Sequence, residues 1–196
     1  MSQIFGRHFD LLFRLALAGS VVLVAGLIAI WRLGIAPAIG APVEQPVPFS
    51  HKHHVGEVGL DCRHCHSTAD SSAYAGMPAS EVCMNCHSHL FTTSSMLAPV
   101  RDSVRDGKPL HWNRVYRLPD FVYFDHAIHV NNGIECAKCH GEVARMPLTW
   151  QASSLQMRWC LDCHRHPQSA VHAAANATKP TLRQAAQLTE CSTCHR

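Results

Sequence analysis

The sequence predicts a mostly helical and irregular protein, with one N-terminal membrane-spanning helix followed by a domain of short helices, little or no sheet and long irregular connections. Three observations support this fold class. Leu15 to Trp31 is a run of seventeen residues without a charge. All ten cysteines form five pairs with two residues between them, and a histidine follows each pair at once. The 134 residues from Cys62 to His195 leave about 27 for each motif, too few to build an apolar core around each one.

The apolar run is long enough to suggest a membrane anchor. At about 1.5 Å per residue it makes roughly 26 Å of helix, slightly short of a bilayer core. Residues 11–13 complete the span if Arg14 extends its charged end toward the lipid headgroups. Arg7 and Arg14 precede the run and Arg32 follows it, a bias that favours a cytoplasmic N-terminus.

The alternative is a cleaved signal peptide. Its apolar region would be long, and the small residues at 36–41 are interrupted by Pro37 and followed by Pro42, so we favour a retained anchor. Both interpretations place the C-terminal part outside the cytoplasmic membrane. The predicted division is a cytoplasmic stub (1–10), a transmembrane helix (11–33), a Pro-rich linker (34–48) and a periplasmic domain carrying the motifs (49–196).

The five cysteine motifs indicate covalent haem. Two cysteines three positions apart lie on one side of a helical turn, so both can form thioethers with one haem, and the next residue supplies an imidazole to the iron. Zinc sites usually combine two pairs, and a structural disulfide would not require the histidine. We number the motifs 1 to 5 in chain order: Cys62, Cys65 and His66; Cys83, Cys86 and His87; Cys136, Cys139 and His140; Cys160, Cys163 and His164; Cys191, Cys194 and His195.

The charge argues against a nucleic-acid partner. The formal net charge is +3, and the basic residues are scattered instead of forming a stripe. Five haems would bring ten propionates, and +3 − 10 leaves a net charge of about −7 if all of them ionise.

The chain contains an internal repeat. Phe-x-His-x-x-His at 49–54 precedes Gly-Leu-Asp-Cys at 59–62, and the same pattern at 124–129 precedes Gly-Ile-Glu-Cys at 133–136. The first histidine lies eleven residues before its cysteine in one copy and ten in the other. The segment 88–123 has no motif and is expected to be an insertion or a surface loop.

The repeat also predicts sixth iron ligands. Its histidines lie three apart on one helical face, so two imidazoles can reach two irons. We assign His51, His54, His126 and His129 to four haems. His53 is left out, because the second copy has Ile128 there, and His89 and His166, which closely follow motifs, are expected on the surface.

The fifth iron has no assigned sixth ligand. A methionine would raise that haem's potential above those with two histidines, and an open position would allow small-molecule chemistry. The alternatives are an open iron or a ligand from His111, His172, Met96 or Met157.

Phe-x-His-x-x-His ahead of Cys-x-x-Cys-His resembles the multihaem class III cytochromes c. The resemblance implies that His51 serves the haem at motif 1 and His126 the haem at motif 3, while His54 and His129 reach other haems. A closer resemblance is to the pentahaem cytochrome c subunit of bacterial alternative complex III. The matching stretches are FSHKHHVGEVGLDCRHCH (49–66), GMPASEVCMNCHS (76–88), LAPVRDSVRDGKPLHW (97–112), LPDFVYFDHAIHV (118–130) and MPLTWQASSLQMRWCLDCHRHP (146–167).

The second resemblance implies a role in quinol oxidation. The subunit would relay electrons from polytopic quinol-binding and iron–sulfur partners to a monohaem or soluble cytochrome c, or directly to a terminal oxidase, and would not be catalytic alone. Two alternatives are a multihaem reductase with one open iron and a stand-alone membrane quinol dehydrogenase. The chain lacks a phosphate loop, a Ser/His/Asp arrangement and a spare thiol, which favours the relay.

Overall fold

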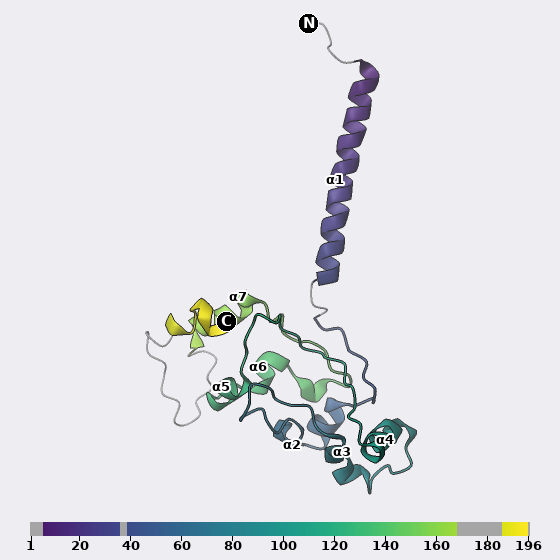
Figure 1. The fold of residues 1–196 in the computed structure, drawn as a ribbon, viewed down its shortest axis with the longest axis vertical. Coiled ribbons are helices and arrows are strands. Elements are labelled where there is room, and N and C mark those ends of the chain that lie inside the picture. Colours follow the sequence, from purple (N-terminus) through teal and green to yellow (C-terminus); the bar gives the residue numbers. More distant parts are fainter. Residues whose placement is uncertain (1–5, 36–38, 168–185, 196) are drawn as a thin grey trace. The chain divides into compact units, whose positions relative to one another are not determined.

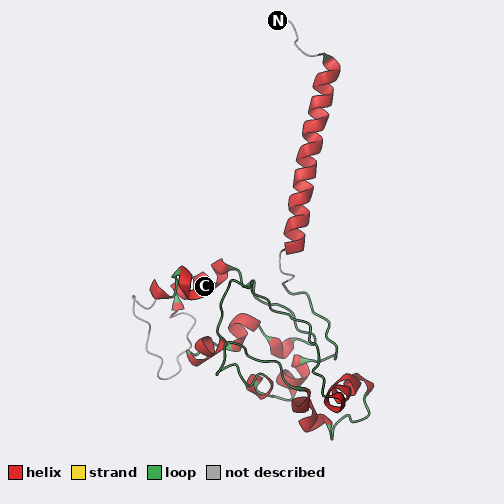
Figure 2. Cartoon of the chain, viewed as in Figure 1, coloured by secondary structure: helices red, strands yellow, loops and turns green. Residues whose placement is uncertain are grey.

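The computed structural model describes residues 6–35, 39–167 and 186–195, and it divides into two compact units, Met1–Ala38 and Ile39–Arg196. Within the described residues, regular structure is helical apart from one isolated bridge between Pro42 and Trp150 (Figure 2). The predicted mostly helical and irregular fold, with one N-terminal apolar helix, is confirmed.

The first unit is the helix α1 (Arg7–Ile35). Its segment His8–Arg32, 25 residues with a mean hydropathy of 2.3, has the length and composition to cross a membrane. Asp10 lies in the first turn and Arg32 in the last, which is the charge order that the helix dipole favours.

The second unit consists of short helices joined by long irregular segments (Figure 1). Each of the five motifs lies on a short helix, so both of its cysteines project from one helical turn. The acid before motif 1 is also a helix cap, because the Asp61 carboxylate accepts a hydrogen bond from Arg63 N at 2.8 Å. The elements are η1 (Lys52–Glu57), α2 (Cys62–Cys65), α3 (Ser80–His87), η2 (Ser95–Leu97), α4 (Ala98–Asp106), α5 (His126–Asn131), α6 (Cys136–His140), η3 (Val143–Arg145), α7 (Met157–Arg165) and α9 (Cys191–Cys194).

The two copies of the repeat fold alike. Their glycines share a left-handed backbone, with φ of 80° at Gly59 and 78° at Gly133. In each copy the residue after that glycine donates to the second histidine's carbonyl, Leu60 N to His54 O at 3.0 Å and Ile134 N to His129 O at 3.1 Å. The first copy's extra residue is absorbed in η1, which is a π-helix where α5 is an α-helix.

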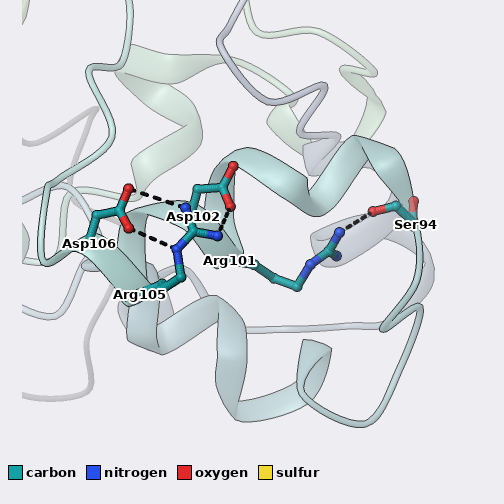
Figure 3. Close-up of polar contacts among 5 residues, drawn as sticks. All are labelled: Ser94, Arg101, Asp102, Arg105 and Asp106. Atoms are coloured by element: carbon teal, nitrogen blue, oxygen red, sulfur yellow. Dashed lines mark hydrogen bonds and ion pairs between the residues drawn. The ribbon is translucent and has the colours of Figure 1, made fainter.

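The segment 88–123 contains a helix where the sequence predicted an insertion or loop. The helix α4 has a proline in its first turn and ends at Gly107, whose φ is +63°. It packs on α3, and Ser103 Oγ lies 2.6 Å from Ser80 Oγ. Figure 3 shows Arg105 paired with Asp102 and Asp106 at 2.7 and 2.8 Å.

Residues 40–47, in the second half of the predicted linker, pack within the second unit. Gly40 N donates to Gln151 O at 2.9 Å, and Val43 N donates to Thr149 O at 3.0 Å. Val47 is buried, and in the described part of the chain only Val100 and Met146 join it as buried apolar residues. So small an apolar core agrees with the expectation that the residues between the motifs are too few to build an apolar core around each one.

Candidate haem-binding sites

Three histidines of the repeat lie opposite motif histidines at closely similar distances. The ring centroids of His54 and His87 are 6.2 Å apart, those of His126 and His140 6.4 Å, and those of His129 and His164 6.1 Å. An iron between two imidazoles requires roughly 6.3 Å, from two metal–nitrogen bonds of about 2.0 Å and about 1.1–1.2 Å from each nitrogen to its ring centre. Each pair therefore leaves the space that one haem iron needs.

The fourth histidine of the repeat lies near motif 1. Burial first, then the nearby His66 and His54, lower the pKa of His51 to about 4. We call each pair a site and number it by its motif: His51 with its neighbour His66 (site 1), and the three opposed pairs His54 and His87 (site 2), His126 and His140 (site 3), and His129 and His164 (site 4).

The imidazoles are oriented through Nδ1. Second-shell hydrogen bonds of this kind fix the tautomer of a metal-bound histidine and leave Nε2 free for the metal. Within the repeat, Nδ1 of His54 lies 2.9 Å from Ser50 O, and Nδ1 of His129 lies 2.7 Å from Asp125 O. Four motif histidines have their Nδ1 near a backbone carbonyl: His66 at 2.7 Å from Gly76 O, His87 at 3.1 Å from Leu90 O, His164 at 2.9 Å from Leu188 O and His195 at 3.2 Å from Phe121 O.

The phenylalanine of each repeat packs on both of its histidines. The Phe49 ring is edge-on to His51 at 4.9 Å and stacked on His54 at 4.5 Å. The second copy has the same geometry, with Phe124 edge-on to His126 at 4.8 Å and stacked on His129 at 4.5 Å. The spacing shared by the two copies thus includes the phenylalanine that packs on both imidazoles.

Half-buried imidazoles are kept neutral, as a metal ligand must be. Burial is the largest cause that lowers the pKa of His140 to about 4, followed by the nearby His126, His66 and His51. Burial likewise lowers the pKa of His129. At neutral pH these rings carry a free nitrogen lone pair.

The residues fit c-type haem better than a bare metal ion. In each site two thiols on one helical turn adjoin a histidine, which matches the two thioethers and the axial ligand of one haem. Among the residues that the structure describes, no group of three or more His, Cys, Asp or Glu could hold a metal ion. Arg101 on α4, beside the helix of motif 2, has a buried Nη1 without a hydrogen-bond partner, while its Nη2 donates to Ser94 O at 2.9 Å (Figure 3). A haem propionate is a suitable acceptor for that free donor.

We call motif 5 site 5, although among the described residues only its motif histidine, His195, is assigned as an axial ligand. The ring of Phe121 stacks on His195 at 5.8 Å. Of the predicted alternatives for its sixth ligand, His111, Met96 and Met157 are exposed, and His172 lies outside the described residues. His53, which was not assigned to an iron, is exposed and its Nδ1 pairs with Glu57 at 2.9 Å.

Several supporting residues were not predicted from the sequence. Thr149 Oγ1 lies 2.8 Å from Nδ1 of His51, and Ala73 O lies 2.9 Å from Nδ1 of His126. The Tyr116 ring packs on His140 at 4.5 Å. These partners belong to no sequence motif, and two of the three act through a backbone carbonyl or an aromatic ring that many residues could supply. The phenylalanines, by contrast, were visible in the repeat.

The covalent and axial donors of the described sites define the chain as a multihaem cytochrome of the c type. Residues 47–101 and 122–196 match the family of cytochrome c7 and related cytochromes c. The chain therefore belongs to that family, whose domains bind c-type haem.

A relative shares part of this sequence. The chain is 39% identical over 98 residues to the multihaem cytochrome c subunit of menaquinone reductase from Nitratidesulfovibrio vulgaris. The alignment covers 50% of this chain and 46% of the relative, so the chain spans about half the length of that protein.

Proposed function

We propose that the chain binds five c-type haems and carries electrons within a quinol-linked membrane complex. The observation that carries the proposal is the set of opposed imidazoles, three pairs of which are separated by 6.1–6.4 Å. Two protein ligands on one iron leave no position for a substrate, so the iron supplies a one-electron couple and no bond-making chemistry. The covalent ligands are the ten cysteines, and the axial ligands are the five motif histidines with His51, His54, His126 and His129.

The proposed assembly is of the alternative complex III type. In it, polytopic quinol-binding and iron–sulfur partners deliver electrons, and a monohaem or soluble cytochrome c or a terminal oxidase receives them. The helix α1 anchors the chain in the cytoplasmic membrane, with the haem domain on the periplasmic side. The support is the resemblance over most of the chain, together with an apolar helix of 25 residues.

The opposite direction of electron flow is a second candidate. The relative in N. vulgaris is named as a subunit of a menaquinone reductase, which would deliver electrons to a quinone. The same opposed imidazoles serve either direction, because a one-electron couple is reversible.

Purification from native membranes in mild detergent tests the proposal. We expect polytopic and iron–sulfur proteins to travel with the chain, and added menaquinol to reduce its haems. If the assembly instead oxidises prereduced haems with menaquinone and not the reverse, the second candidate holds. Haem reduction by quinol in the purified chain alone would favour the stand-alone dehydrogenase.

A carbon monoxide titration separates electron transfer from catalysis at an open iron. We expect the spectra of sites 1 to 4 to be unaltered in the reduced protein, because both axial positions are occupied. Carbon monoxide binding at one of these four sites would contradict their assignment. Binding at the fifth haem alone would show an open iron there and would support the multihaem reductase.

A further inference from the structure

Each element that carries the repeat's histidines serves two sites. His51, the N-cap residue of η1, belongs to site 1 and His54, within η1, to site 2, and the two residues lie three apart. α5 presents His126 to site 3 and His129 to site 4 in the same way. Three residues of helix rise about 4.5 Å, so the sites that share an element adjoin each other.

The first copy of the repeat is bonded to the segment after motif 3. Lys52 N donates to Met146 O at 3.0 Å, and Nδ1 of His51 lies 2.8 Å from Thr149 Oγ1. η1 packs closely enough on η3 that a Cβ added at Gly56 would overlap the carbonyl oxygen of Ala144.

The second copy is bonded, reciprocally, to the segment after motif 1. Ala127 N donates to Ser72 O at 3.1 Å, and Nδ1 of His126 lies 2.9 Å from Ala73 O. Asn131 Nδ2 donates to Asp70 O at 2.9 Å.

This exchange brings sites 1 and 3 together. Each is completed by a histidine held against the segment that follows the other's motif. The first cysteines of the two motifs are also neighbours, since Cys136, after burial, is among the causes that raise the pKa of the Cys62 thiol.

Site 5 adjoins site 4. Nδ1 of His164 lies 2.9 Å from Leu188 O, in the segment that leads into motif 5. Tyr123 N, just before α5, donates to Cys194 O at 2.8 Å. Cys160 of motif 4 also has Cys194 of motif 5 as a near neighbour.

We propose that the five sites form one unbranched row in the order 2–1–3–4–5, so that sites 2 and 5 are the ends at which electrons are exchanged with partners. The row rests on the proposed haem-binding function and adds a path to it. Figure 1 supports the two ends, because within the second unit α3 lies far from α7 and the C-terminal segment. The order differs from the order along the chain, in which motif 1 comes first.

The row assigns each transfer to one pair of neighbours. Electron transfer between redox centres falls steeply with their separation, so it occurs between adjoining sites. Each transfer oxidises one site by one electron and reduces its neighbour by one, with no bond broken in the chain's own residues. At the two ends of the row, electrons are exchanged with a quinol-linked partner and with a one-electron partner of the cytochrome type.

Ligand variants that mark one site test the row in the haem-loaded full chain. A methionine in place of an axial histidine raises the potential of that haem, which then reduces first. A reduced low-spin haem is diamagnetic, so its magnetic effect on adjoining ferric haems disappears from their electron paramagnetic resonance spectra. For His54→Met, at the end of the row, we expect one other signal to change. For His126→Met and His129→Met, inside the row, we expect two.

The matched control is His53→Met, on the same element as His54 but exposed and paired with Glu57; it should change no signal. Two or more changed signals for His54→Met, or a single one for both interior variants, would overturn the row. If a variant fails to load haem, iron positions in the experimentally solved wild-type protein decide instead: 2–1, 1–3, 3–4 and 4–5 must be the nearest pairs. Neither readout involves quinol. The row can therefore be refuted while quinol still reduces the haems, and the row can hold even if quinol does not reduce them.

Discussion

At the scale of single residues, Thr149 has a role that differs from those of its counterparts. It offers a hydroxyl to Nδ1 of His51 at 2.8 Å, whereas the other axial histidines with a described Nδ1 contact meet a backbone carbonyl. When Nε2 binds iron, Nδ1 carries the proton and the hydroxyl accepts it. An acceptor at this position raises the basicity of the ligand and orients its ring.

We therefore predict that Thr149→Val changes one haem. The less basic imidazole stabilises ferric iron less well, so the potential of that haem should rise and its low-spin signal should shift. Affinity at the metal should fall about 10- to 100-fold, the usual loss when a second-shell partner of a metal ligand is removed. Thr149→Ser keeps the hydroxyl and should restore the wild-type potential in a redox titration. A serine variant that behaves like valine would contradict the role of the hydroxyl.

A second residue prediction concerns the sixth ligand of site 3. His126→Ala leaves His140 as the one protein ligand there, so one haem in five should become high-spin and should bind carbon monoxide. Absorption and electron paramagnetic resonance spectra measure both changes. His53→Ala, an exposed neighbour of the first copy's ligands, is the control and should leave all spectra unaltered. No high-spin haem in His126→Ala would refute the assignment.

At the scale of elements, η1 combines two constraints. As a π-helix, it takes up the one extra residue that separates the first copy's histidines from motif 1, whereas α5 is an α-helix. It also packs against η3 through Gly56. His51 at its N-cap and His54 within it belong to different sites. A change in its packing should therefore disturb two haems at once.

The substitution Gly56→Ala tests this packing. The added Cβ overlaps the Ala144 carbonyl, so η1 must shift, at a cost of about 1–3 kcal/mol in the free energy of unfolding. Denaturant unfolding followed by haem absorption measures the loss, and the signals of sites 1 and 2 should shift together. Lys52→Ala, an exposed position on the same element, serves as the control and should change stability by less than about 0.5 kcal/mol. A shift confined to one site would contradict the shared element.

At the scale of the whole molecule, the second unit begins before the predicted domain boundary. The sequence placed the haem domain at 49–196, whereas the second compact unit starts at Ile39. Residues 40–47 contribute hydrogen bonds to Thr149 and Gln151 as well as the buried Val47.

Two truncations distinguish these boundaries. A chain that starts at Ile39 should be soluble, should load haem and should keep the wild-type spectra, since it retains the whole unit. A chain that starts at Phe49 loses Val47, worth about 1.5 kcal/mol or more, and several hydrogen bonds of about 1 kcal/mol each. Its melting temperature, followed by haem absorption, should be clearly lower. Equal melting temperatures would show that residues 39–48 do not stabilise the domain.

The anchor is tested on the full chain. If α1 is retained in the membrane, carbonate washing should leave the haem protein in the membrane pellet, because a predominantly apolar span of 25 residues holds it there regardless of surface charge. Release of a haem protein that lacks the N-terminal residues would show a cleaved signal instead.

The features that depend on local spacing could be predicted from the residues alone. Each of the five motifs, the apolar helix and each copy of the Phe-x-His-x-x-His repeat is a short continuous segment. Residue types and their intervals were therefore sufficient to predict these features. The difference of eleven and ten residues between copies was also visible, although its accommodation as a π-helix was not. The tertiary structure was needed to show which imidazoles of the repeat lie opposite motif histidines. Those contacts join residues far apart, such as His51 and Thr149, 98 positions apart, and His126 and Ala73, 53 apart. The path of the intervening chain brings them together, and the carbonyl and hydroxyl acceptors involved belong to no motif.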